Sequence, residues 1–318
     1  MAQALNIVDF HCHHVPPRFE LTTLLTAPAS QRARWARTNK VICDERALLQ
    51  DIDAGDISAR VVNTPTAHIC DANGHVPHDV TMQINDALAR LVERHPGRIH
   101  ALATVDAYDG DHAARELVRA VAQLGLKGVF VECARGDMMI DAPQARPVLE
   151  AAAQLGVPVF VHPVNPQPFL GRMEPYGRIG TLFARGTVNS AALIALIEGG
   201  AFTAMPSLRI VVTALAMGGL SLAAGFSSMS KLPDGTRNVL RNNVFVDTMG
   251  FAPALIRLSV DLLGAGNVLA GSDWPIVNDG PIRPVVETAL REAGLTDAQQ
   301  EQVAGANALR LLGVFPES

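Results

Sequence analysis

The sequence predicts an α/β fold, the (β/α)8 or TIM barrel, in which eight parallel strands alternate with helices and close into a ring. Eight short apolar segments alternate along most of the chain with segments whose apolar residues recur at helical spacing. The length of 318 residues suits such a barrel with insertions. The alternative, an open doubly wound sheet, would carry a Gly-x-Gly-x-x-Gly loop after an early strand, and the chain has none. We expect residues 1–318 to form a single domain.

The eight predicted strands are short apolar runs bounded by polar or turn-forming residues. They cover residues 5–10, 59–63, 98–104, 127–132, 157–162, 208–214, 243–247 and 267–271. Two long segments, residues 15–40 and 163–187, follow strands one and five, and the first of them has no clear periodicity. In a barrel both insertions would lie over the carboxyl ends of the strands, where active sites form.

The predicted helices have recognisable first and last residues. Asp79 is expected to cap one helix, Gly156 to end another, and Thr296-x-x-Gln299 to form a capping box at the start of the last. The helical ranges are 44–54, 79–92, 114–124, 143–155, 189–198 and 296–312. Each range lies between two predicted strands or follows the last one, as the barrel requires.

Composition excludes several classes of protein. Apolar residues make up 48% of the chain and charged residues 18%, which supports a large core and argues against disorder. The net charge of −5 leaves no basic stripe for phosphates, so no nucleic-acid partner is expected. The four cysteines are scattered, which is typical of reduced thiols in a cytoplasmic protein. No signal peptide is visible, and no uninterrupted apolar run is long enough to predict membrane insertion.

Four potential metal ligands lie at predicted strand ends. His11 and His13 alternate along the first strand, so their side chains share one face about 7 Å apart. His162 ends the fifth strand, and Asp273 follows the eighth, which neighbours the first strand in a closed barrel. Three nitrogens and one oxygen suit one Zn²⁺ per chain with an open coordination position. Mn²⁺, Fe²⁺ and Co²⁺ are also compatible with these ligand types.

Three stretches of this chain resemble the amidohydrolase superfamily. They are DFHCH at residues 9–13, FVHP at residues 160–163 and GSDWP at residues 271–275. Within it, the chain resembles the branch that contains aminocarboxymuconate-semialdehyde decarboxylase and hydroxybenzoate decarboxylases. NDAL at 85–88, HPGR at 95–98, LGLKG at 124–128 and NALRLL at 307–312 extend the likeness over nearly the whole chain. The resemblance implies a homodimer with one metal ion per barrel, usually zinc. Its ligands would be His11, His13, His162 and Asp273, with Asp273 also transferring the proton.

The resemblance is broken after strand six. The family usually has a His there, followed shortly by Gly-Gly, but Ala216 stands at that position before Gly218 and Gly219, and no His follows His162. In the family this His orients or deprotonates metal-bound water or hydrogen-bonds the substrate. Either the chain belongs to a subgroup that works without it, or it is a disabled variant. The apolar context of Ala216 favours the first explanation.

Seven further residues are expected to line the substrate pocket on loops or strand ends at the barrel mouth. They are Arg18, Glu132, Arg135, Phe169, Arg172, Ala216 and Trp274. An arginine there would hold a substrate carboxylate bidentately, although each one alone is more typical of a surface charge. Glu132 is interpreted as a pocket residue or a partner behind the metal ligands, and Phe169 as part of a lid or as packing within its insertion. Either one of His68, His75 and His78, in the loop after strand two, substitutes for the missing His, or all three are solvated loop residues, which is the favoured interpretation.

Three functional hypotheses follow. The first is a non-oxidative decarboxylase of a small aromatic or unsaturated carboxylic acid, in which Asp273 delivers the proton. The second is a hydrolase of an amide, lactone or ring C–N bond, in which Asp273 is the base for a metal-bound water. The third is a disabled metal-binding barrel, against which the retention of all four ligands argues. Carbon dioxide release and incorporation of oxygen from labelled water distinguish the first two.

Overall fold

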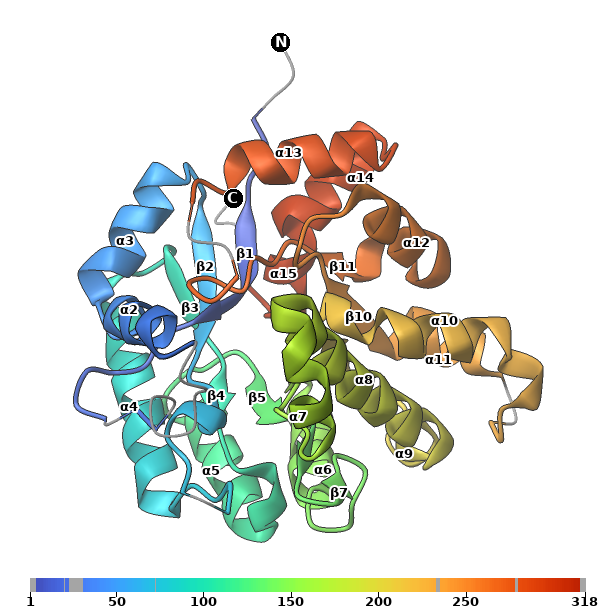
Figure 1. The fold of residues 1–318 in the computed structure, drawn as a ribbon, viewed down its shortest axis with the longest axis horizontal. Coiled ribbons are helices and arrows are strands. Elements are labelled where there is room, and N and C mark those ends of the chain that lie inside the picture. The colour runs from blue at the N-terminus through green and yellow to red at the C-terminus, as the bar shows by residue number, and fades with distance from the viewer. Residues whose placement is uncertain are drawn as a thin grey trace.

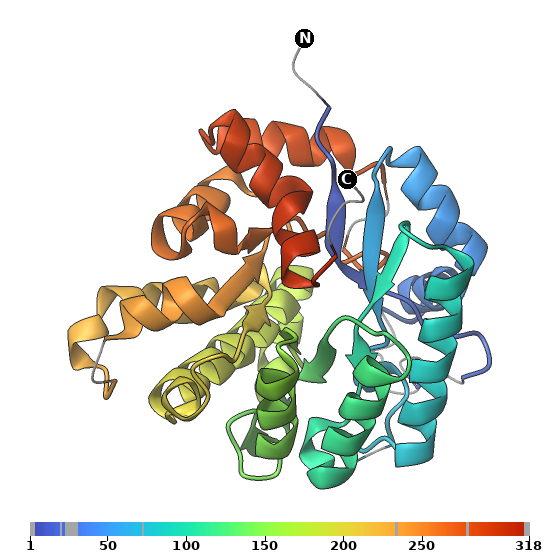
Figure 2. The ribbon, with the colours of Figure 1, turned by 180° about the vertical axis from the view of Figure 1, so that it is seen from behind.

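The computed structural model describes residues 4–19, 21–22, 31–71, 73–232, 235–277 and 280–314. Its strands lie at the centre and helices surround them, as Figures 1 and 2 show from opposite sides. The parallel strands are β1 (Val8–His13), β2 (Ala59–Asn63), β3 (Ile99–Ala101), β4 (Ala103–Thr104), β5 (Val129–Glu132), β8 (Val159–His162), β9 (Ile210–Val212), β10 (Val244–Asp247) and β11 (Val268–Leu269). They pair in the orders β1-β2-β3 and β11-β10-β9-β8-β5-β4. The predicted parallel α/β architecture is therefore confirmed.

Helices follow most of the strands and pack on their outer faces (Figure 1). Their bounds are α2 Arg32–Ile42, α3 Glu45–Ala54, α4 His78–Arg94, α5 Asp111–Ala122, α6 Arg146–Leu155, α7 Phe169–Met173, α8 Gly177–Glu198, α9 Ala201–Ala204, α10 Met217–Gly225, α11 Thr236–Asn243, α12 Pro253–Leu263, α13 Arg283–Glu292, α14 Asp297–Glu301 and α15 Asn307–Leu311. A short antiparallel pair, β6 (Ala134–Arg135) and β7 (Met138–Met139), follows β5.

Local sequence signals located several helix ends correctly. Gly156 ends α6 in the left-handed conformation, and the capping box between Thr296 and Gln299 opens α14. The expected cap at Asp79 is wrong, because α4 begins one residue earlier at His78 and Asp79 lies in its first turn. A carboxylate there still faces the positive end of the helix dipole.

The segment over residues 163–187, interpreted from the sequence as an insertion, is largely helical. Helices α7 and α8 occupy most of this segment, and α8 begins at Gly177, well before the predicted start at residue 189. Its glycines lower helix propensity in isolation, but they allow close packing against α10 and the 3-10 helix η5 (Ala214–Ala216). Among the described residues, the stretch Phe169–Glu198 is also long and apolar enough, by length and composition alone, to span a membrane. Core helices of soluble proteins pass the same test.

Alternation along the strands separates two parts of the core. Val129 and Val131 on β5 belong to the larger cluster, which includes apolar residues of the surrounding helices, whereas Phe130 belongs to a smaller cluster contributed mainly by the strands. Phe160 on β8 belongs to the same small cluster. Each buried Phe contributes about 2 kcal/mol of burial energy. The strand face that carries Phe130 and Phe160 continues into Glu132 and His162, so this packed layer supports the site above it.

Strand β1 departs from simple alternation at the point where it approaches the site. Its register with β2 shifts between Asp9 and Cys12. Phe10 packs in the small cluster, and the next residue, His11, also turns inward, with its ring 4.9 Å from that of Phe160. An irregularity of this kind re-aims side chains within a strand.

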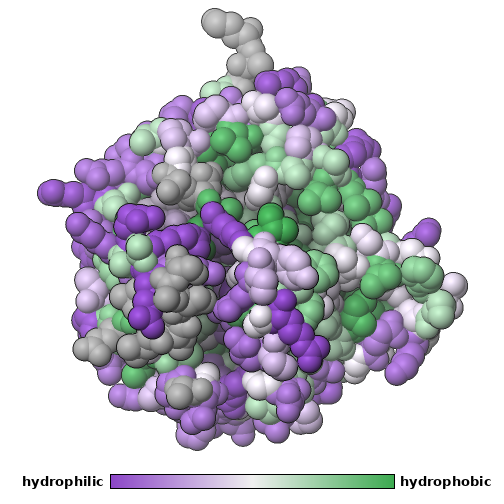
Figure 3. Space-filling view, viewed as in Figure 1, coloured by the Kyte–Doolittle hydropathy of each residue, from purple (hydrophilic) through white to green (hydrophobic). Residues whose placement is uncertain are grey.

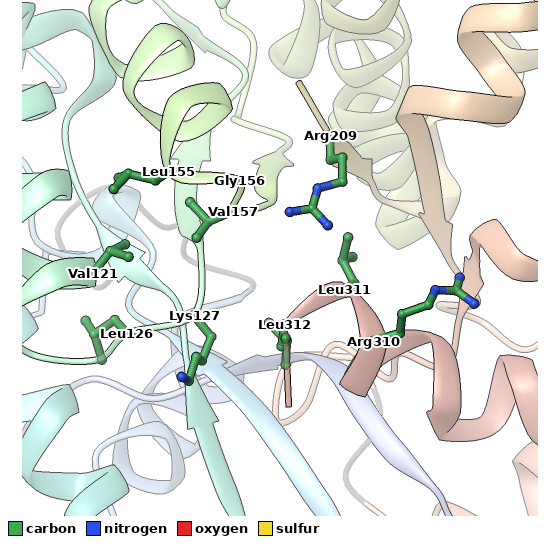
Figure 4. A pocket seen from close by; sticks show the side chains of 11 residues that line it. Val121, Leu126, Lys127, Leu155, Gly156, Val157, Arg209, Arg310, Leu311 and Leu312 are labelled. Atoms are coloured by element: carbon green, nitrogen blue, oxygen red, sulfur yellow. The ribbon is translucent and has the colours of Figure 1, made fainter. Parts of the chain in front are cut away.

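A small cavity of about 250 Å³ lies at the opposite end of the strands, beside the residues that precede β5, β8 and β9. Its wall includes Lys127, Arg209 and Arg310, which Figure 4 shows pointing in different directions. Arg310 donates to the carbonyl of Gly266. Because these cations do not converge, the cavity does not form an anion site.

Candidate metal centre

The four predicted ligands meet at the carboxyl ends of three strands. His11 and His13 come from β1, His162 from the end of β8, and Asp273 follows β11. One ring nitrogen from each of the three histidines lies within 4.8 Å of the others. Oδ1 of Asp273 lies 3.5 Å from Nε2 of His11 and 3.1 Å from Nε2 of His13. All four side chains are buried.

Each histidine is oriented by an oxygen atom on the side of the ring away from this centre. The Nδ1–oxygen distances are 2.6 Å from His11 to Asp247, 2.7 Å from His13 to Asn63 and 3.1 Å from His162 to Glu132. Donation from Nδ1 fixes the tautomer in which Nε2 carries the free lone pair. The three Nε2 atoms are therefore the potential metal ligands.

The donor atoms at this centre fit a divalent cation. Nε2 of His11, Nε2 of His13 and Oδ1 of Asp273 are buried and make no hydrogen bond of acceptable geometry with the described residues. A buried polar atom without a partner costs about 1–3 kcal/mol, so three in one place imply a bound group. Imidazole nitrogen and carboxylate oxygen are typical ligands of zinc and also suit manganese.

Electrostatics within the centre favour the ligand forms of most of these groups. Burial lowers the pKa of His13 and of His162, which keeps their imidazoles neutral. Burial acts to raise the pKa of Asp273, but the adjacent His11 and His13 outweigh it and the net pKa is lowered. Burial acts to lower the pKa of His11, but Asp247 and Asp273 raise it overall.

The backbone at Asp273 is held in the left-handed region, with φ of 58°. A non-glycine residue in this conformation costs roughly 1 kcal/mol or more and persists only where its surroundings enforce it. Asp273 N donates to His11 O over 2.8 Å, and Asp273 O accepts from Ile276 N over 2.7 Å. These bonds fix the carboxylate beside the histidine pair.

Two predicted pocket arginines bond to the protein itself. Arg18 donates to the carbonyl of Gln83 over 2.6 Å. Arg135 donates to Asp106 over 2.7 Å and lies over the Tyr108 ring. That Arg18 and Arg135 contact the substrate remains a prediction. To bind a substrate carboxylate, each arginine would have to give up or share its present hydrogen-bond partner.

The other predicted pocket residues lie in different environments. Trp274 is 2% exposed and packs its ring against Arg60, so it contributes to the core. Phe169, the first residue of α7, contacts the ring of Phe183. Arg172 is exposed on the same helix α7. Ala216 is fully buried in η5. Nearby, Ala214 N donates to the Asp247 carboxylate that also orients His11, which links η5 to the metal centre.

Glu132 connects the centre to the loop after β2. Its Oε2 lies 3.1 Å from His162 Nδ1, and its Oε1 accepts from Thr66 Oγ1 and Ala67 N, both over 3.2 Å. Burial raises the pKa of Glu132 to about 7. The interpretation of Glu132 as a partner behind the ligands agrees with this geometry.

The structure also places residues at the centre that the sequence did not reveal. The interpretation of His68 as solvated is wrong: it is 5% exposed, and the charges of His13 and Asp273 act on it. Burial lowers its pKa to about 3. Arg185 on α8 lies with Nη2 3.5 Å from His162 Nε2. Asn63 and Asp247 end strands β2 and β10, so the strand-end criterion that found the ligands would also have found them.

Parallel strands with a buried three-histidine, one-aspartate centre at their carboxyl ends define a metal-dependent α/β enzyme. The family model described as Amidohydrolase matches residues 8–314, and the chain belongs to this family.

The chain is also similar to decarboxylases within this family. It is 26% identical over 290 residues to 2-amino-3-carboxymuconate-6-semialdehyde decarboxylase of Dictyostelium discoideum, covering 86% of this chain and 77% of the relative. It is 27% identical to gamma-resorcylate decarboxylase of Polaromonas sp., covering 74% and 78%. The fold matches 5-carboxyvanillate decarboxylase of Novosphingobium aromaticivorans with a TM-score of 0.84 at 19% identity, covering 98% and 97%. That structure is a complex with manganese and 4-hydroxy-3-methoxy-5-nitrobenzoic acid.

Proposed function

We propose that this chain is a metal-dependent, non-oxidative decarboxylase of a small aromatic or unsaturated carboxylic acid. The observation that carries the proposal is the buried convergence of three imidazole Nε2 atoms with Oδ1 of Asp273. The names of the relatives, which are decarboxylases of resorcylate, carboxyvanillate and aminocarboxymuconate semialdehyde, support this reaction class.

The reaction exchanges a carbon–carbon bond for a carbon–hydrogen bond. A proton adds to the unsaturated carbon, the bond to the carboxylate breaks, and its electron pair restores the unsaturated system as carbon dioxide leaves. A divalent cation bound by the four ligands supplies Lewis acidity toward substrate oxygens. Asp273 is the proton-transfer group: its carboxylate, ionised as a metal ligand, takes a proton from a substrate hydroxyl and passes it to carbon.

Ala216 favours decarboxylation over hydrolysis. A hydrolase must orient a water molecule and stabilise an oxyanion, and a methyl group at position 216 donates no hydrogen bond to either. Decarboxylation uses no activated water, so the reaction tolerates the missing imidazole.

The reaction is tested by incubating the metal-loaded protein with a panel of hydroxybenzoic and unsaturated acids. We expect carbon dioxide release and, in heavy water, a product with deuterium at the carbon that lost the carboxylate. Incorporation of oxygen from labelled water without carbon dioxide release would instead establish the hydrolase. Neither signal across the panel would favour a disabled metal-binding barrel.

We infer that the metal is Zn²⁺. Three imidazole nitrogens and one carboxylate oxygen match the ligands of catalytic zinc. Manganese in the related carboxyvanillate decarboxylase makes Mn²⁺ the main competitor. Metal analysis of protein purified without added metal should find about one zinc ion per chain. Manganese in the same proportion would replace zinc in the assignment without altering the site.

We also infer that the two parallel sheets form one closed (β/α)8 barrel in a single domain over residues 1–318. Phe10 N donates to Ala270 O over 2.8 Å and His13 N to Trp274 O over 2.9 Å, which supports closure between β1 and the end of β11. Leu102 joins β3 to β4 directly, which supports continuity on the other side. On this view the segments after strands one and five are insertions at the mouth. A single cooperative unfolding transition is expected.

A homodimer in the cytoplasm completes the proposal. Exposed apolar side chains support contact with a second copy of the chain. They include Ile179 and Phe183 on α8 and Leu222 on α10. Hydrophobic surface covers the side of the molecule where α10 and α12 lie in Figure 3. The four free cysteines agree with a reducing compartment. Light scattering should give twice the mass of one chain, and a monomer at working concentration would contradict the dimer.

A further inference from the structure

Helix α8 directs one side chain, Arg185, toward the metal centre. Its Nη2 lies 3.5 Å from Nε2 of His162, and its Nη1 donates to Asn165 Oδ1 over 3.0 Å. Its positive charge is also felt by the carboxylates of Glu132 and Asp273. A guanidinium group therefore lies directly beside a nitrogen that the proposed function assigns to the metal.

Close packing of α8 against η5 fixes this position. A Cβ atom on Gly186 would come within 2.8 Å of the Leu215 carbonyl oxygen, so only glycine permits the observed approach. Ala216, the next residue of η5, is fully buried. Small residues on both elements thus bring the helix backbone close to the strand-six loop, and the residue adjacent to Gly186 is Arg185.

His162 has only one ring nitrogen available as an acceptor, so Arg185 and a metal would compete for it. His162 Nδ1 is engaged by Glu132, so Nε2 offers its single lone pair either to Arg185 or to a metal. When a metal takes this lone pair, the Nη2 donor loses its acceptor, and the guanidinium faces a second positive charge. An anionic oxygen between the two cations restores the acceptor and offsets their repulsion.

His68 also carries a buried polar atom without a partner among the described residues, and the charges of His13, Arg185 and Asp273 act on its ring. His68 Nδ1 is buried and makes no hydrogen bond with the described part of the chain. The His68 ring packs edge-on against Trp35, with centroids 5.7 Å apart, and is 5% exposed. The charges of Arg185 and Asp273 both act on His68, which places it within electrostatic range of the same space. A polar ligand in that space would satisfy both Arg185 and His68.

We propose that Arg185 binds an anionic oxygen of the substrate beside the metal and supplies the hydrogen-bond donor that Ala216 cannot. This inference rests on the proposed function for the presence of the metal. The oxygen belongs to a planar oxyanion and comes either from the substrate carboxylate or from an ionised hydroxyl on the ring. Arg185 is not among the arginines that the sequence singled out.

The test measures ligand binding, so it needs no turnover. Calorimetry of the metal-loaded protein is carried out with benzoate, whose only anionic group is a carboxylate, and with 4-nitrophenolate, whose only anionic group is an ionised hydroxyl and which has no group ortho to it. R185M is compared with wild type and with R146M, which removes an exposed arginine paired with Glu150 on α6. Metal content is measured for every variant.

R185M should bind at least one of the two probes about 10–100-fold more weakly, since it loses a charge-assisted hydrogen bond. The probe that is affected identifies the source of the oxyanion. R146M should bind both like wild type, and R185K should fall between, because an ammonium keeps the charge and loses the planar fork. Metal content should stay near one per chain.

Unchanged affinity for both probes in metal-loaded R185M would overturn the inference. Weakened binding in a protein that decarboxylates no substrate would uphold Arg185 as the oxyanion anchor and defeat the proposed reaction instead. If R185M does not fold, R185K with full metal and wild-type affinity for both probes would likewise overturn the inference.

Discussion

At the scale of single residues, Asp273 is constrained both by its side-chain contacts and by its backbone conformation. Its Oδ1 lies within 3.5 Å of two histidine Nε2 atoms, and its backbone adopts a conformation that few non-glycine residues accept. Burial acts to raise the pKa of Asp273, but the neighbouring His11 and His13 outweigh it and the net pKa is lowered. In the proposed function the same carboxylate serves as a metal ligand and as a proton acceptor.

Replacing Asp273 by Asn should separate these two roles. The amide retains an oxygen for the metal but cannot exchange a proton, so the rate should fall about 10²–10⁴-fold, the usual contribution of a general acid or base. Steady-state rates and metal content are measured together. A variant with near wild-type rate and full metal would exclude Asp273 as the proton-transfer group.

His14 should make stability depend on pH in a predictable direction. Burial lowers its pKa to about 4, below the usual 6.5 of the unfolded chain. The unfolded state therefore binds more protons between these values, so stability is greatest above pH 6.5, falls as pH drops toward about 4, and then levels off. The loss amounts to about 3 kcal/mol.

The pH prediction is checked with H14L by urea unfolding in the presence of a chelator. Between about pH 7 and about pH 4.5 the variant should lose less stability than wild type, although other buried histidines still contribute. Equal losses in both proteins would show that His14 does not titrate as its burial requires.

At the scale of elements, the contact between α8 and η5 determines which side chains lie beside the metal centre. Gly186 lies too close to the Leu215 carbonyl for any side chain, and Ala216 is fully buried beside it. Ala216 belongs to the larger core cluster, so an imidazole at position 216 would have to fit among packed side chains. This packing supports a native subgroup rather than a disabled site.

Ala216→His tests this conclusion. A new imidazole should overpack the contact, which costs about 1–3 kcal/mol, and should lower both activity and melting temperature. Thermal unfolding and steady-state rates of the variant are compared with wild type. A large gain in rate would mean that the alanine disables the site and would reverse our interpretation.

At the scale of the whole molecule, the proposed metal site joins distant parts of the chain. His11, His162 and Asp273 are contributed by β1, β8 and the segment after β11, so an ion bound there would cross-link three regions of the fold. Binding that occurs only in the folded state stabilises it by mass action.

Metal removal should therefore lower the melting temperature. At a free metal concentration about 1,000 times Kd the stabilisation is about 4 kcal/mol, which corresponds to roughly 5–10 °C. H162A should lose most of the metal and this response, whereas H78A, whose ring packs on His112 away from the centre, should keep both. Full metal occupancy in H162A would contradict the ligand assignment.

Local chemistry in the sequence was sufficient to predict the class of fold and to single out the four side chains that converge in the structure. The alternation of His11 and His13, and the placement of His162 and Asp273 at strand ends, follow from the two-residue period of a strand and need no tertiary information. Tertiary structure alone decided the rest of the centre. Arg185 reaches the ligands because small residues let α8 pack closely on η5, and His68 is buried because its loop bonds to Glu132. Both depend on contacts between segments far apart in the chain, which no local period encodes.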